Sequence, residues 1–221
     1  MSPAIPIIAA AAACAFLAYQ HTAPNDDSDA QDTADQPDIS PQDTGNSFTE
    51  VIQTTQSAMQ ASSQASANVQ AFLKTIRVAE GTEKANNPYA VVYAYAFTIT
   101  DFSAHPAELG WRGVPLSAAM CANAGLSNGC VSTAAGAYQF IKPTWRSMGQ
   151  PDFSPHSQDA ACIKMLARLG ALRDVENGNL TSATAKCAGT WASLPGNTYR
   201  QGGKTLQQVA QIYQSAGGAI V

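Results

Sequence analysis

Charged side chains are scarce in this sequence, and basic ones are missing from its first third. Only 13% of the 221 residues are charged, the net charge is −4, and the first basic residue is Lys74. Residues 74–221 carry twelve basic and eight acidic side chains, a mild +4. A general nucleic-acid-binding protein needs a strongly basic face. We therefore expect no nucleic-acid partner.

Metal-ligand spacings are also missing. The sequence contains no C-x-x-C or H-x-x-x-H spacing, and His105 and His156 stand alone. Structural zinc sites require such paired ligands. We therefore expect no metal site and no cofactor.

Long hydrophobic runs are limited to the N-terminus. Residues 4–19 form an uncharged, Ala-rich run of sixteen residues, just short of the roughly 17 to 25 that span a bilayer comfortably. We interpret residues 1–21 as a signal-anchor or a signal peptide. The missing positive n-region favours the uncleaved anchor, whereas small residues offer cleavage sites. The acidic flank that follows favours export of the rest of the chain.

The next two segments are polar. Residues 22–47 are rich in Asp, Gln, Ser, Thr and Pro, too poor in apolar area to offset chain entropy, so we expect an acidic flexible linker. Residues 48–67 are predicted to be helical but polar, forming either a stalk or a loosely docked helix.

The body begins near Asn68 and is predicted to be mainly helical. Apolar residues at three- and four-residue spacing predict a helix over 68–79, with Asn68 as its cap. Alternation at period two after Pro88 predicts a strand or short meander over 89–100. Further helices are expected over 133–148, 157–169, 180–193 and 205–215. The expected fold class is α+β, with one small antiparallel sheet.

Four of the five cysteines lie in this body: Cys121, Cys130, Cys162 and Cys187. An even number fits an exported, oxidised domain. Three pairings are open in principle. The sequential pairing is the economical one, because the first two residues bracket a Gly/Asn-rich loop and the other two fall on successive predicted helices.

The carboxyl of Glu80 is the candidate catalytic group. Glu80 follows the apolar helix and precedes Gly81-Thr82. A carboxyl desolvated there has a raised pKa, which a general acid requires. On this pattern alone, a surface glutamate is the commoner outcome.

Five segments, taken in order and spacing, resemble the phage lambda-type endolysins, which are lysozyme-like lytic transglycosylases that cut peptidoglycan. The segments are Ala71–Thr82, Phe97–Pro106, Ser132–Gln139, Phe153–Ala160 with Gly170–Leu172, and Cys187 with Trp191–Gly196. The resemblance covers about two-thirds of the chain, and residues 68–221 are the expected catalytic domain.

The resemblance implies a lysozyme-like fold with Glu80 as the catalytic acid, while Tyr138 and Gln139 would line the saccharide cleft. Sugar rings stack on aromatic faces, so further candidates for contact with the substrate are Tyr93, Tyr95, Trp191 and Tyr199. A core role is as good an interpretation for Trp191. Asp101 is a candidate cleft-wall residue.

Two mechanisms are open. A lytic transglycosylase needs one carboxyl, whereas a hydrolytic muramidase would normally add a second, for which Glu83, Asp101 and Glu108 are the candidates. The one-carboxyl mechanism of a lytic transglycosylase is preferred. A non-catalytic glycan-binding virion protein is a third alternative. The expected partners are glycan strands, the inner membrane through residues 1–21, and virion components if the enzyme is carried in a particle. The expected location is the periplasm.

The regions 109–131 and 195–204 depart from the family pattern. In the family they form lips over the substrate cleft, so a Cys121–Cys130 bridge would stiffen one lip.

Overall fold

A computed structural model describes residues 47–196 and 203–221 of the chain. The expected apolar segment 1–21, the linker up to residue 46 and Tyr199 lie outside these residues. Within the two described ranges, none of the helices combines the length and the apolar character that a membrane span requires.

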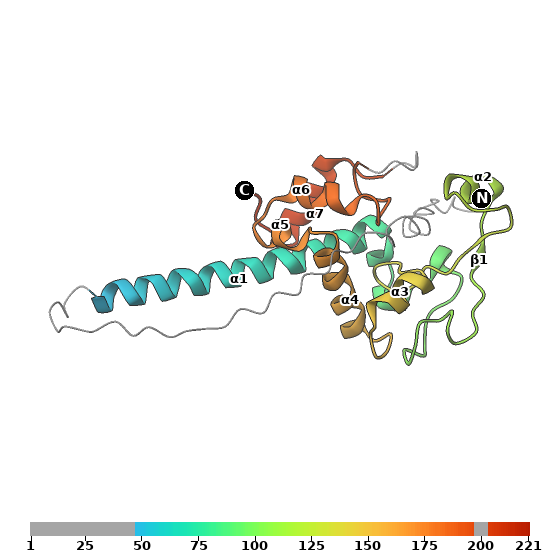
Figure 1. Cartoon of the computed structure of the whole chain (residues 1–221), viewed down its shortest axis with the longest axis horizontal. Helices are drawn as coiled ribbons and strands as arrows, with labels where there is room; N and C mark the ends of the chain where they lie inside the picture. The colour runs from blue at the N-terminus through green and yellow to red at the C-terminus, as the bar shows by residue number, and fades with distance from the viewer. Residues whose placement is uncertain (1–46, 197–202) are drawn as a thin grey trace, which may run out of the picture.

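The longest element is α1 (Ser47–Glu80), a single helix of 34 residues. Figure 1 shows its first half extending beyond the other elements and its second half lying inside the body. The polar helix and the helix of the body, predicted to meet at Asn68, are therefore continuous. Asn68 does not act as a cap, because it lies in the interior of α1, and its buried side chain makes tertiary contacts instead. It donates to Glu176 O and accepts from Ala219 N, both at 2.9 Å.

The second half of α1 is the centre of the helical lobe. It packs against α4 (Pro155–Arg168), α5 (Leu172–Glu176) and α7 (Leu206–Ser215). Its apolar stripe, including Phe72, Leu73 and Ile76, is fully buried. Each such side chain contributes roughly 1.5–3 kcal/mol by leaving water. This burial holds the end of α1, and therefore Glu80, in a fixed place.

The other helices only partly follow the predicted ranges. A helix over 133–148 was expected, but α3 covers only Lys142–Met148. The reason is a tight turn at Gly136 and Gln139, which both have positive φ; a Cβ at residue 136 would lie 2.3 Å from Gln158 Oε1. The helix α6 (Leu180–Cys187) also ends earlier than the expected residue 193.

The small sheet is present, but not where it was predicted. It pairs β1 (Val114–Pro115) with β2 (Val131–Ser132) in antiparallel register, Val114 opposite Ser132. The predicted strand over 89–100 is wrong. That segment forms two 3₁₀ turns, η3 (Pro88–Ala90) and η4 (Tyr93–Tyr95), with isolated bridges at Val91 and Val92. Positive φ at Ala94 and Tyr95 breaks the extended conformation.

One of the two predicted disulfides is formed. Cys121, in α2 (Ala118–Asn123), is bonded to Cys130 with a Cα separation of 5.8 Å. The predicted Cys162–Cys187 bridge is wrong, because both residues are free thiols. Both are buried in the core, and burial raises the pKa of each thiol. This keeps them as neutral thiols that pack like small apolar side chains.

Candidate active site

Glu80 is the last residue of α1, and its carboxyl is almost fully buried, with the residue 5% exposed. The helix ends there because Gly81 has φ of 81°, a left-handed conformation that suits glycine and terminates helices. The turn that follows is fixed by Thr82, whose hydroxyl donates to Ala137 O at 2.8 Å. This bond fixes the end of α1, and with it Glu80, against the segment around Ala137.

The two carboxyl oxygens of Glu80 have different surroundings. Oε1 accepts a hydrogen bond from the Ser193 hydroxyl at 2.5 Å. Oε2 is buried and has no hydrogen-bond partner among the described residues. An unsatisfied buried oxygen is costly in a folded protein, and such atoms call for an explanation. Here the explanation can be a functional one, because Oε2 is the oxygen left to exchange a proton.

The electrostatics of Glu80 fit that role. Burial raises the pKa of its carboxyl to about 7, and the hydrogen bond from Ser193 partly opposes this rise. At neutral pH the protonated and ionised forms are then both well populated. A group with its pKa near the working pH can both donate and accept a proton.

Ser193 was not among the residues singled out from the sequence. It lies beyond α6, between Trp191 and Leu194, both of which are buried in the core. The Trp191 indole nitrogen donates to Tyr138 O at 3.1 Å, which ties this segment to the one around Ala137. The Trp191–Gly196 match was the only signal near Ser193, and it did not identify the serine.

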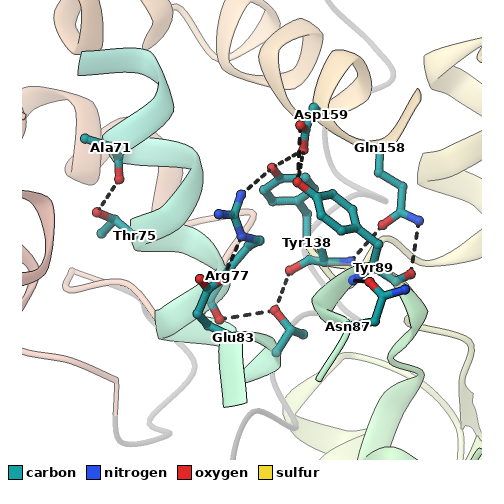
Figure 2. Close-up of polar contacts among 11 residues, drawn as sticks. Ala71, Thr75, Arg77, Glu83, Asn87, Tyr89, Tyr138, Gln158 and Asp159 are labelled. Atoms are coloured by element: carbon teal, nitrogen blue, oxygen red, sulfur yellow. Dashed lines mark hydrogen bonds and ion pairs between the residues drawn. The ribbon is translucent and has the colours of Figure 1, made fainter. Parts of the chain in front are cut away.

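A network of polar side chains lies beside the helix end, as Figure 2 shows. Arg77 Nε is 2.8 Å from Glu83 Oε2, and Arg77 Nη1 donates to the Tyr138 hydroxyl at 3.2 Å. The hydroxyls of Tyr138 and Tyr89 both donate to Asp159, at 2.5 Å and 3.0 Å. This network joins α1, η3 and α4. It also engages Glu83 in an ion pair.

Two of the predicted substrate-binding residues are core residues. Tyr138 is fully buried, and Trp191 is 1% exposed, so neither ring faces solvent as a stacking platform would. Their polar atoms make internal contacts instead: the Trp191 indole donates to Tyr138 O, and the Tyr138 hydroxyl donates to Asp159. Aromatic residues were expected near the substrate, but the same residue type also suits a core.

The remaining predicted residues are spread over the body. Gln139 is buried, with φ of 51°, and its amide donates to Gly136 O at 2.9 Å. Tyr93 is half-buried in η4. Asp101 is exposed and accepts from Ser103 N at 2.8 Å. Hydrogen bonding from the Ser103 side chain, and then from its backbone N–H, lowers the pKa of the Asp101 carboxyl.

In the described part of the chain, no three His, Cys, Asp or Glu side chains gather as a metal site would need. His105 is buried, and its ring is used internally: Nδ1 accepts from Ala107 N, and Nε2 lies 2.9 Å from Phe140 O.

A mainly helical body with a two-stranded sheet and one buried glutamate at a helix end is a lysozyme-like arrangement, and the solved structures bear this out. Bacteriophage lambda lysozyme in complex with a chitohexasaccharide matches with a TM-score of 0.58 and 30% identity, over 70% of this chain and 97% of that one. Another structure of lysozyme from bacteriophage lambda matches with a TM-score of 0.56 and 27% identity, with the same coverage.

Sequence relatives narrow this class to one family. The endolysin of Escherichia phage P2 is 33% identical over 156 residues, covering 68% of this chain and 93% of the relative. The endolysin of Escherichia phage lambda is 31% identical over 159 residues, covering 68% and 91%. The endolysin family model matches residues 70–220, and the chain belongs to the endolysin family. It is a lysozyme-like enzyme of the kind that degrades peptidoglycan.

Proposed function

We propose that this endolysin is a lytic transglycosylase in which Glu80 is the only catalytic carboxyl. As an acid, Glu80 protonates the glycosidic oxygen between N-acetylmuramic acid and N-acetylglucosamine. As a base, it then takes the proton from the C6 hydroxyl of the muramyl residue, whose oxygen bonds to C1. The product is a 1,6-anhydro sugar, and no water is consumed.

The observation that carries the proposal is the state of the Glu80 carboxyl. It is buried, its Oε2 is unpartnered among the described residues, and its pKa is about 7. A single group that must act as an acid and then as a base works best when neither form is strongly preferred.

The other candidate carboxylates are engaged elsewhere, which supports the one-carboxyl mechanism. A hydrolase would place a second carboxylate roughly 5 to 9 Å from the first. Glu83 is paired with Arg77, and Glu108 is paired with Arg146 at 2.6 Å. Asp101 is exposed and accepts from Ser103 N, a local turn interaction.

Three matched variants of the full chain test the proposal. Glu80→Gln should abolish the release of soluble fragments from purified Gram-negative peptidoglycan. Glu83→Gln and Asp101→Asn, which also replace a carboxylate by an amide, should keep most of the activity. Loss of activity in either of these two would favour the hydrolytic muramidase. A wild-type protein that binds the wall without degrading it would favour the glycan-binding alternative.

We also propose that the body acts in the periplasm, held at the inner membrane by residues 1–21. The apolar run and the acidic flank support export. A linker of 26 flexible residues would reach roughly 25 to 30 Å on average, which would let an anchored enzyme contact the wall.

The short, weakly hydrophobic anchor further suggests release when the membrane potential collapses. Fractionation after an uncoupler should then find the protein in the soluble fraction; retention in the membrane would contradict release.

A further inference from the structure

An exposed aromatic side chain lies directly beside the candidate catalytic residue. Tyr95 is 52% exposed, although it is a large aromatic residue. Its hydroxyl donates a hydrogen bond of 2.6 Å to Gly81 O, and Gly81 is the residue that follows Glu80. This contact places the Tyr95 hydroxyl at the end of α1 while about half of the residue stays open to solvent.

The backbone that presents Tyr95 is strained. Ala94 and Tyr95 are consecutive non-glycine residues with φ of 56° and 54°. L-amino acids rarely adopt this left-handed conformation, and when they do it is usually at single positions. Glycine would relieve the strain at either position. Strain of this kind persists where the surrounding structure over-determines it, and such positions cluster at functional sites.

The strained turn is well anchored on both sides. Tyr93 N donates to Ala134 O at 2.8 Å, and Val91 forms a bridge to Thr98. Farther along the turn, Phe97 is 42% exposed and packs edge to face on Trp111, with ring centroids 5.4 Å apart. The turn therefore fixes the position of Tyr95 and leaves aromatic surface uncovered.

We propose that Tyr95 forms a glycan-binding subsite next to Glu80, with its ring stacked on a sugar ring of the peptidoglycan strand. The inference rests on the proposed function and deepens it, because it assigns one sugar contact to Tyr95, which the structure singles out among the aromatic candidates by its exposure and its hydrogen bond to Gly81. Binding sites for small polar ligands commonly combine aromatic surface with a few fixed polar groups. Here the Tyr95 ring supplies the surface, and Glu80 supplies the reacting group.

Two substitutions in the full chain separate the ring from the hydroxyl. Tyr95→Gly removes the ring and relieves the backbone. Tyr95→Phe keeps the ring and the strain but loses the hydrogen bond to Gly81. Leu206→Ala, which shortens an exposed apolar side chain on α7, is the matched control. Each variant is compared with the wild type in KM and kcat on purified glycan strands. Affinity for chitohexaose is measured in the Glu80→Gln background, and the melting temperature is recorded for all.

We expect Tyr95→Gly to raise KM and the Kd for chitohexaose by about three- to tenfold, the effect of losing one aromatic contact. Its melting temperature should be unchanged or higher, because the relief of strain at residue 95 offsets the lost hydrogen bond to Gly81. Tyr95→Phe should stay within about twofold of the wild type in Kd. If Tyr95 had only a structural role, Tyr95→Gly would instead lower the melting temperature and leave the Kd for chitohexaose unchanged.

The inference is overturned if the wild type degrades peptidoglycan and Tyr95→Gly has wild-type KM and Kd. It is also overturned if Leu206→Ala weakens binding as much as Tyr95→Gly. Failure of the proposed function gives a different result: the wild type releases either fragments with reducing ends or no fragments at all. The Kd series then still tests the subsite.

Discussion

The buried carboxyl of Glu80 should make the stability of the protein depend on pH in a way that one substitution removes. Its pKa is raised by burial from 4.5 to about 7 in the folded protein. The folded state therefore binds this proton more tightly than the unfolded chain does. The resulting stabilisation is fully present below about pH 4.5 and is lost as pH rises through about 7.

The magnitude follows from the size of this change. A difference of about 2.5 between the unfolded and folded pKa values corresponds to about 3 kcal/mol. Between pH 4 and pH 8, the wild type should lose about this much unfolding free energy through Glu80. Glu80→Gln cannot ionise and should not lose it. The stability of the variant relative to the wild type should therefore increase by about 3 kcal/mol over that range.

Urea unfolding of both proteins at pH 4, 6 and 8 measures the difference directly, and other titrating groups cancel because both proteins contain them. Asp101→Asn is a suitable control, because that carboxyl is exposed and its pKa is lowered rather than raised. Its stability relative to the wild type should not increase with pH. Parallel curves for the wild type and Glu80→Gln would refute the conclusion that Glu80 is a desolvated carboxyl.

Three further predictions concern the surroundings of this site. Ser193→Ala removes the hydrogen bond that lowers the pKa of Glu80, and a hydrogen bond to a charged acceptor contributes about 1.5–3 kcal/mol. The pH at which kcat falls on the alkaline side should therefore rise by about one to two pH units. An unchanged pH profile would contradict this role of Ser193. Asn68→Ala leaves Glu176 O and Ala219 N without their partner and should cost about 2–3 kcal/mol in urea unfolding; a loss below about 0.5 kcal/mol would show that these bonds do not matter. Reducing the Cys121–Cys130 bridge should lower turnover on cell walls more than it lowers the melting temperature, if this region forms the lip of the cleft that the family resemblance implies. Equal turnover with and without reductant, at an unchanged melting temperature, would argue against that role.

The helices of the lobe were the most predictable part of the fold. Spacing of three and four residues marked the second half of α1, and the helices predicted over 157–169 and 205–215 correspond to α4 and α7. These two helices begin after Ser154 and Thr205, whose side chains cap them. The strand predicted after Pro88 was wrong because an alternation of large and small residues carries no information about the backbone angle φ. The turn that holds the left-handed Ala94 and Tyr95 depends on contacts outside the segment: the Tyr95 hydroxyl donates to Gly81 O, and the neighbouring Tyr93 N donates to Ala134 O.

The candidate site was predictable only in part, for a similar reason. Glu80 was singled out because the resemblance to the endolysins marks it; the local pattern of an apolar helix followed by a glycine would on its own favour a surface glutamate, and its burial appears only in the structure. Ser193 lies 113 residues further along the chain, and only the tertiary fold brings its hydroxyl to Glu80. The side-chain chemistry of Tyr138 and Trp191 suits a cleft wall and a core equally well, so their burial could not be read from the sequence.

The most direct test of the central claim is the chemistry of the product. Purified Gram-negative peptidoglycan would be digested with the full chain, with Glu80→Gln in parallel, and the released muropeptides identified by mass spectrometry. We predict products that carry 1,6-anhydro ends, one water lighter than the hydrolytic products, and none from Glu80→Gln. Muropeptides with reducing ends would contradict the one-carboxyl mechanism.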